Sequence, residues 1–304
     1  MKIVFLATPD FAVNALKALH AKHEIQAVVT QPDKAGNRGK IVSPPIKIIA
    51  DELGLPIFQF ENINSDGVEI LQNFKPDLLI TAAYGQLLSE KILSIAKHGT
   101  LNIHASLLPK YRGASPINSV LINGEKQTGI TIMRTVKKLD AGDILLSKVF
   151  PIDDDINAGE LTEALSKIGA EAIVEAIELI KKGQAIFTPQ DENEATFCKK
   201  ISAQTERIDW TKSANEIHNL VRGLSPTPCA WTMLNGKRLK IIKTEVSLIK
   251  GEKAMVIDCG KQGITIGCGE NSVIIKTLQY EGKNVMSAAD FINGRKIAVK
   301  DKLE

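Results

Sequence analysis

The first half of the sequence alternates short apolar segments, rich in β-branched residues, with amphipathic helical patterns. This alternation restricts the possible folds more than any other feature. The apolar segments lie at residues 2–8, 25–30, 77–83 and 100–105, and helical patterns lie at 11–22 and 46–53. Strands separated by helices form βαβ units, whose mostly parallel sheet is covered on both faces. The predicted fold class is therefore α/β with a doubly wound sheet.

The sequence also predicts more than one domain, because 304 residues exceed the usual size of one hydrophobic core. Two further strand patterns at 129–136 and 143–150 are followed by a long Ala-rich helix from Gly159 to about Lys182. The polar, aperiodic stretch that comes next is typical of a linker. We expect a first domain at 1–188, a linker at 189–205 and a second domain at 206–304.

The last third of the chain differs from the rest in pattern and in charge. One helix pattern from Ser213 to Val221 precedes short apolar runs, which Gly-containing turns separate at intervals of about 8 to 12 residues. This spacing predicts a small antiparallel barrel or sandwich. From Glu206 onward there are 16 Lys and Arg against 11 Asp and Glu, a difference of +5 in a chain of net charge +3. Such a basic region suits a polyanionic partner, although a solvated surface explains it equally well.

Several common functions lack their motifs in this sequence. The turn after the first strand, ATPDFA, lacks the GxGxxG of dinucleotide sites, and neither a GxxxxGK[ST] nor a GxSxG motif is present. The four cysteines and five histidines show no zinc-ligand spacing, so we expect no metal site. No apolar run is about 18 residues long, as a membrane span requires. We therefore expect a cytoplasmic protein.

The predicted strand TLNIHA places two reactive side chains together. Residues two apart in a strand point to the same side, so Asn102 and His104 should project together near the carboxyl end of the strand. Ligands of doubly wound sheets bind at that edge. An amide can donate to an oxygen that gains negative charge, and an imidazole can move a proton near neutral pH, which suits acyl transfer. Alternatively, both side chains satisfy buried backbone groups.

The residues that follow, SLLPKYRGASP, combine two prolines and a glycine where the next helix should begin. Such a loop is suited to holding a fixed shape. In the turn LDAGD, Asp140 could orient a histidine and stabilise its charged form. An Asp in a turn more often caps that turn, and sequence spacing does not show that Asp140 meets His104.

With these motifs the chain resembles the methionyl-tRNA formyltransferase family from end to end. The matching segments are ATPDFA, TQPDKAGNRGK, AAYGQLL, LNIHASLLPKYRGASPI, TGITIM, LDAGDIL, VRGLSPTPCAW, LNGKRLKI and MSAADFINGRK. The signature within LNIHASLLPKYRGASPI is specific to the superfamily that uses 10-formyltetrahydrofolate, and the C-terminal segments narrow the resemblance to the tRNA enzymes. The resemblance implies a Rossmann-like formyltransferase domain and a C-terminal barrel of the oligonucleotide-binding type.

The resemblance also assigns roles to residues. It implies a catalytic trio of Asn102, His104 and Asp140. It implies a folate-binding loop at Ser106, Leu107, Leu108 and Pro109. The co-substrate would be 10-formyltetrahydrofolate and the acceptor the methionine amine of initiator methionyl-tRNA. A formyltransferase that acts on a sugar-nucleotide amine and a formyltetrahydrofolate hydrolase keep the same trio and remain alternatives. A non-catalytic RNA-binding protein is disfavoured by the intact trio.

The resemblance implies two contacts with tRNA, one through the positive charge of the C-terminal barrel and one through the basic loop between Gln31 and Lys47. We expect Lys34, Arg38 and Lys40 to bind the acceptor stem, since cationic side chains dominate affinity for nucleic acids. The protein is expected to be a monomer. The chain departs from the family at Thr227, where an aromatic residue is usual, and at Cys229, where glycine is usual. It also departs at Lys137 and Lys138, which stand where acidic residues are common.

Overall fold

The computed structural model describes residues 1–35 and 41–304, and the chain forms two compact units. The first unit comprises Met1–Gly113, Gln127–Pro151 and Thr162–Phe197. The second comprises Ala114–Lys126, Ile152–Leu161 and Cys198–Glu304. The second unit thus includes two short segments that lie, in the sequence, between segments of the first unit. The domain limits at 188 and 206 remain a prediction.

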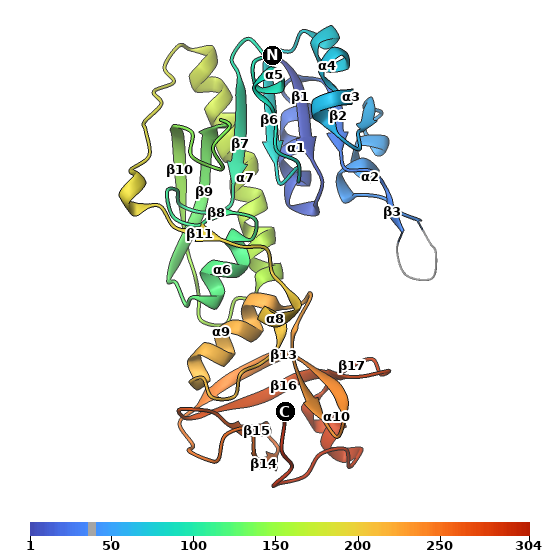
Figure 1. Ribbon diagram of the computed structural model, residues 1–304, viewed down its shortest axis with the longest axis vertical. Helices are drawn as coiled ribbons and strands as arrows, with labels where there is room; N and C mark the ends of the chain where they lie inside the picture. Colours follow the sequence, from blue (N-terminus) through green and yellow to red (C-terminus); the bar gives the residue numbers. More distant parts are fainter. Residues whose placement is uncertain (36–40) are drawn as a thin grey trace. The chain divides into compact units, whose positions relative to one another are not determined.

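The first unit is built on a seven-stranded sheet of order β10-β9-β7-β6-β1-β2-β5 (Figure 1). Its strands are β1 (Lys2–Ala7), β2 (Glu24–Thr30), β5 (Ile57–Gln59), β6 (Leu78–Ala82), β7 (Thr100–His104), β9 (Gln127–Arg134) and β10 (Ile144–Pro151). Neighbouring strands from β7 to β5 are parallel, whereas β9 is antiparallel to both of its neighbours. A short hairpin pairs β3 (Lys34–Ala35) with β4 (Ile41–Val42).

Helices cover both faces of this sheet, which confirms the doubly wound α/β class. One face carries η1 (Asp10–Ala12), α1 (Val13–His20), α2 (Pro45–Glu52) and the long α7 (Ala158–Lys181). There, Ser166 of α7 donates a hydrogen bond to the carbonyl of Phe11. On the other face, α3 (Ile63–Asp66), α4 (Val68–Phe74) and α5 (Glu90–Leu93) bury an apolar cluster with alternate residues of β1, β2 and β6. Strands β1 and β6 are buried and largely apolar on both faces because both faces of the sheet are covered.

The second unit contains the predicted antiparallel β structure. Its six-stranded sheet joins β12 (Ala230–Leu234), β13 (Lys237–Ser247), β14 (Val256–Gly260), β15 (Gly263–Gly267), β16 (Ser272–Tyr280) and β17 (Val285–Ser287). The helices of this unit are α6 (Pro116–Ile122), α8 (Ala203–Glu206), α9 (Ala214–Leu224) and α10 (Ala288–Asn293). Backbone hydrogen bonds connect Glu304 to Met233 of β12 and Leu303 to Ala254, just before β14. The last residues therefore link the two edge strands and close the sheet.

Two details of the chain bear on the sequence predictions. Cys229, which stands where the resemblance predicts glycine, has a φ of 76°, in the left-handed region that glycine adopts most easily. Its buried side chain bonds to the carbonyl of Pro226. In residues 1–35 and 41–304, no helix is both long enough and apolar enough to cross a bilayer.

Candidate active site

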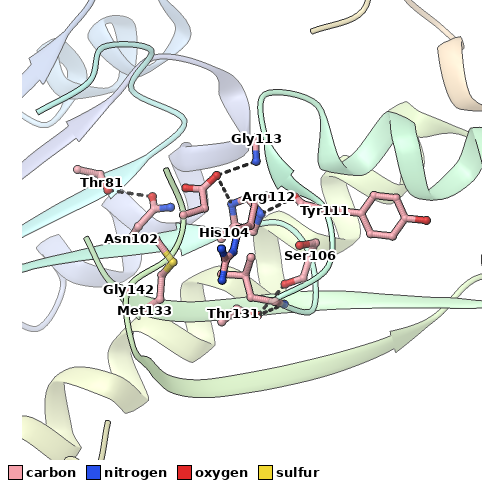
Figure 2. A network of polar contacts seen from close by, with 12 residues as sticks. Thr81, Asn102, His104, Ser106, Tyr111, Arg112, Gly113, Thr131, Met133 and Gly142 are labelled. Carbon is pink, nitrogen blue, oxygen red and sulfur yellow. Dashed lines mark hydrogen bonds and ion pairs between the residues drawn. The ribbon is translucent and has the colours of Figure 1, made fainter. Parts of the chain in front are cut away.

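Asn102 and His104 lie on the same side of β7, as the alternation of strand residues predicts (Figure 2). Between them, Ile103 points to the opposite side, where its side chain faces Gly169 of helix α7. Asn102 is partly exposed, and His104 is 5% exposed. The two polar side chains therefore occupy the sheet face away from α7, at the carboxyl end of the strand.

The neighbouring strand fixes the orientation of the Asn102 amide. Thr81 of β6 is in register with Asn102, and its hydroxyl donates to the Asn102 Oδ1 at 2.8 Å (Figure 2). Because the amide oxygen accepts this bond, the NH₂ group of Asn102 is directed away from Thr81. It can therefore donate hydrogen bonds to a bound molecule.

The backbone of the following loop fixes the His104 ring. The Nε2 of His104 lies 3.0 Å from the carbonyl oxygen of Tyr111. A carbonyl oxygen only accepts hydrogen bonds, so the Nε2 carries a hydrogen and donates it. The Nδ1 is then the nitrogen that can take up or release a proton. It lies 3.8 Å from the Oδ2 of Asp140, so the structure brings together the pair that sequence spacing could not connect.

The Asp140 carboxylate is held by the loop that follows His104. Its Oδ2 accepts a hydrogen bond of 2.8 Å from the backbone N–H of Gly113. Asp140 and Tyr111 both have left-handed backbones, with φ values of 47° and 61°. This conformation costs roughly 1–2 kcal/mol for a residue other than glycine. Both loops that touch His104 are thus held in unfavourable conformations by their surroundings.

The predicted folate-binding residues form a tightly bonded loop. The buried Ser106 uses its hydroxyl to donate to the carbonyl of Lys110 at 2.7 Å. Thr131 of β9 donates to the Ser106 carbonyl and accepts from the N–H of Leu108. Leu108 is buried, whereas Leu107 and Pro109 are partly exposed. The sequence did not single out Thr131, because nothing local distinguishes it from other strand threonines.

A segment that we call the clasp, Thr188–Thr196, forms hydrogen bonds with the end of this loop and with the residues that follow it. Thr188 exchanges two backbone hydrogen bonds with Ile144 of β10. At its other end, the Thr196 hydroxyl accepts from the N–H of Tyr111, and the Thr196 carbonyl accepts from the N–H of Arg112. Most of this segment falls in the predicted linker, and its irregular backbone agrees with that pattern. Its bonds to the loop were not predicted.

Side chains of the clasp surround Arg112, which is fully buried. Gln190 accepts two hydrogen bonds from this guanidinium, and Glu192 accepts two more at 3.1 and 3.2 Å. Lys138, one of the departures from the family pattern, donates to Glu192 at 2.6 Å. The hydrogen bonds from Arg112 and then Lys138 lower the pKa of Glu192 to about 2. Lys137, a further departure from the family pattern, lies 4.0 Å from the carboxylate of the exposed Glu90.

The predicted tRNA-binding residues are only partly within the described structure. Lys34 is exposed on β3, whereas Arg38 and Lys40 lie outside the described residues. Lys47, at the end of the basic loop, donates to Asp33 at 2.7 Å and to Gln59. The bonds from Lys47 and Gln59 lower the pKa of Asp33. Lys47 therefore neutralises the single acid of the loop.

The arrangement around His104 is suited to proton transfer and to binding an oxyanion. It combines an amide donor, an imidazole with one nitrogen directed at a carboxylate, and that carboxylate. Within the part of the chain that the structure describes, no three His, Cys, Asp or Glu side chains are grouped closely enough to hold a metal ion. The amide can supply a hydrogen-bond donor, and the imidazole beside its carboxylate can supply a general acid and a general base.

Comparisons with known proteins identify the family. Residues 1–177 match the formyl transferase family and residues 200–296 match the formyl transferase C-terminal domain. The methionyl-tRNA formyltransferase of Thermodesulfovibrio yellowstonii is 46% identical and that of Macrococcus caseolyticus 42% identical, each over 97% of this chain and 96% of the relative.

A solved structure shares the fold at lower identity. The N-formyltransferase of Helicobacter canadensis, in complex with folinic acid and dTDP-3-aminofucose, superimposes with a TM-score of 0.69 at 19% identity. The match covers 92% of this chain and 99% of that one, and at this identity it indicates the fold alone. The two closer relatives and the two family matches show that the chain belongs to the methionyl-tRNA formyltransferase family.

Proposed function

We propose that this protein transfers the formyl group of 10-formyltetrahydrofolate to the α-amine of methionine on initiator methionyl-tRNA, for translation initiation. The observation that carries the proposal is the grouping of Asn102, His104 and Asp140 on one face of the sheet. The substrates in this proposal are inferred from the relatives. Both are methionyl-tRNA formyltransferases, and each matches this chain over almost its whole length. We also propose that the protein acts as a monomer in the cytoplasm, where translation begins.

The proposed mechanism uses one proton carrier. Asn102 donates its amide hydrogen to the formyl oxygen as the amine adds to the formyl carbon and that oxygen becomes negative. The Nδ1 of His104 takes the proton that the amine nitrogen loses. Asp140, 3.8 Å from this nitrogen, stabilises the imidazolium. His104 then delivers the proton to N10 of the folate as the bond between carbon and N10 breaks. The oxygen regains its double bond, and His104 is again neutral.

We further propose that the loop at Ser106, Leu107, Leu108 and Pro109 holds the folate. The hydrogen bonds of the loop support this proposal. The Ser106 hydroxyl already donates to the Lys110 carbonyl, and the Leu108 N–H already donates to the Thr131 hydroxyl. The loop therefore offers mainly the apolar surfaces of Leu107 and Pro109, which suit a flat ring system. Its fixed shape would place the formyl group near His104.

A transfer assay tests the proposed function directly. We expect formyl transfer from 10-formyltetrahydrofolate to methionylated initiator tRNA, and slower transfer to methionylated elongator tRNA. A dTDP-amino sugar and water serve as competing acceptors, since a sugar-nucleotide formyltransferase and a hydrolase would share the trio. Equal or faster formylation of the sugar amine, or release of free formate as the main reaction, would contradict the proposal. A lack of turnover with every acceptor would favour a non-catalytic RNA-binding protein.

The second unit offers a surface for the body of the tRNA. Trp231 of β12 has the Arg238 guanidinium 4.3 Å and the Arg207 guanidinium 5.8 Å from its ring centre. Lys237 lies 6.0 Å from the Tyr280 ring, beside a cavity of about 340 Å³ that Arg238 and Tyr280 help to line. Cations interleaved with aromatic rings bind phosphates and stack on bases. We propose that this surface and the basic loop, with Lys34, Arg38 and Lys40, bind the tRNA.

The double variant Lys237→Ala, Arg238→Ala tests this surface. We expect a higher KM for methionyl-tRNA with little change in kcat, because these residues would contact the tRNA and take no part in the chemical step. The salt dependence of tRNA affinity should weaken, by a slope of roughly 0.7 to 0.9 for each lost phosphate contact. Lys261→Ala, in the exposed turn between β14 and β15, removes a charge from the same unit and is the control. Equal salt slopes for all three proteins would rule out this surface as the contact.

A further inference from the structure

Gln190 of the clasp connects the two loops that hold His104 and Asp140. Its side-chain oxygen accepts hydrogen bonds from the Arg112 Nη2 at 2.7 Å and from the Arg112 Nε at 3.0 Å. Its side-chain nitrogen donates to the carbonyl oxygens of Asp140 at 2.8 Å and of Gly142 at 2.7 Å. An amide group has one oxygen and two N–H hydrogens, so all of these polar atoms are used.

The two loops joined in this way act on His104 from different sides. The Arg112 loop contributes the Tyr111 carbonyl that fixes the His104 Nε2 and the Gly113 N–H that binds the Asp140 carboxylate. The other loop carries Asp140 itself, with its backbone in the left-handed region. Gln190 therefore closes a ring of contacts that runs through both loops and includes the 3.8 Å approach of Asp140 to His104.

Burial of Arg112 makes this ring stiff. The guanidinium is fully buried, and a buried charge without partners would be costly, so Gln190 and Glu192 cannot easily leave it. Gly142 adds a steric restriction, because a Cβ at this position would lie 1.8 Å from the carbonyl oxygen of Arg134. The Asp140 loop thus fits closely against the end of β9, and Gln190 holds it there.

From this geometry we propose that Gln190 is a positioning residue for formyl transfer, which sets the separation between the Asp140 carboxylate and the His104 ring. It touches neither substrate in this role. The expected effect of Gln190 on the rate rests on the proposed function. Its effect on the position of Asp140 and His104 does not depend on which substrate the protein uses. Its two consequences are therefore measured separately.

The kinetic test uses two substitutions, one that removes the whole contact and one that removes half of it. Gln190→Ala removes all of it, whereas Gln190→Glu keeps an oxygen for Arg112 and turns an oxygen toward the carbonyls of Asp140 and Gly142. We expect both variants to lower kcat by about 10²-fold, the effect of misplacing a catalytic group by about 1 Å, with KM for both substrates unchanged. Asn193→Ala is the matched control, since its side chain donates to Asp191 two residues away in the same segment.

A double-mutant cycle distinguishes positioning from a general loss of stability. If Gln190 acts through Asp140, then Gln190→Ala should lower kcat by a much smaller factor in an Asp140→Asn background than in the wild type. Asparagine tolerates the left-handed backbone at position 140, so this background keeps the loop conformation. The same fold loss in both backgrounds, or an unchanged kcat in both Gln190 variants, would overturn the proposal.

The structural test needs no turnover. Nitrogen-15 spectra of the histidine side chains, with His104 assigned from its own alanine variant, report the hydrogen bonding of its ring. We expect the His104 resonances to change or broaden in Gln190→Ala and to match the wild type in Asn193→Ala. Identical His104 resonances in Gln190→Ala would overturn the positioning role. If the wild type transfers no formyl group, the proposed function fails and these spectra still decide the role of Gln190.

Discussion

Replacing His104 with alanine is expected to lower kcat for formyl transfer by about 10²- to 10⁴-fold, the usual contribution of a general acid and base. The physical reason is that its Nδ1 is the proposed carrier for the proton that moves from the amine to N10. The Nε2 is already bonded to the Tyr111 carbonyl, so no other nitrogen of the ring can substitute. Single-turnover measurements with saturating donor and methionyl-tRNA give this rate directly, and KM should change little.

His20→Ala is the control for this prediction, since His20 is an exposed residue at the end of α1. Its rate should equal that of the wild type. The buried position of His104 means that alanine also leaves a small cavity, so thermal unfolding of each variant has to be compared. If His104→Ala is folded and as fast as the wild type, His104 moves no proton in the rate-limiting step, and the mechanism is wrong.

Asn102→Ala is expected to lower kcat by about 10²- to 10³-fold, the effect of removing one donor to an oxyanion. The bond from Thr81 orients the amide before any substrate binds, so the donor needs no rearrangement during the reaction. KM should remain similar, because the amide interacts most strongly when the formyl oxygen is negative. Rates measured over a range of concentrations of both substrates separate the two constants.

Two related substitutions make the test of Asn102 sharper. Asn102→Asp keeps the shape and the acceptor for Thr81 but turns a negative oxygen toward the reacting carbonyl, so its loss should be at least as large. Thr81→Ala keeps the amide and loses only its orientation, so its loss should be smaller. A raised KM with normal kcat in Asn102→Ala would instead mean that Asn102 binds substrate and transition state equally.

Local patterns were sufficient to predict most of the fold and one half of the site. Strands buried on both faces are continuous apolar runs, which is why β1 and β6 were located within one or two residues. The period of two along β7 placed Asn102 and His104 on one face, as observed. The short helices α3 to α5 were not predicted, because four to seven residues carry too little periodicity.

The rest of the site depends on contacts between segments far apart in the sequence. Asp140 was placed beside His104 only by the family resemblance, since 36 residues separate them and no local rule connects a turn to a strand end. Gln190 lies in a polar, aperiodic stretch that resembles a linker. The role of Gln190 depends on its hydrogen bonds to residues far away in the sequence, and no local pattern reveals such partners. The pairing of Arg112 with Gln190 spans 78 residues.

The position of the clasp matters to anyone who recombines enzymes of this kind. A chimaera joined at residue 177, where the match to the formyl transferase model ends, would take Thr188–Thr196 from the donor of the C-terminal part. The segment from the other parent would then have to form the hydrogen bonds to the buried Arg112 guanidinium and to the carbonyl oxygens of Asp140 and Gly142. Placing the crossover after Cys198 keeps these contacts within one parent. Exchange of acceptor specificity by recombination should therefore succeed only with the later junction.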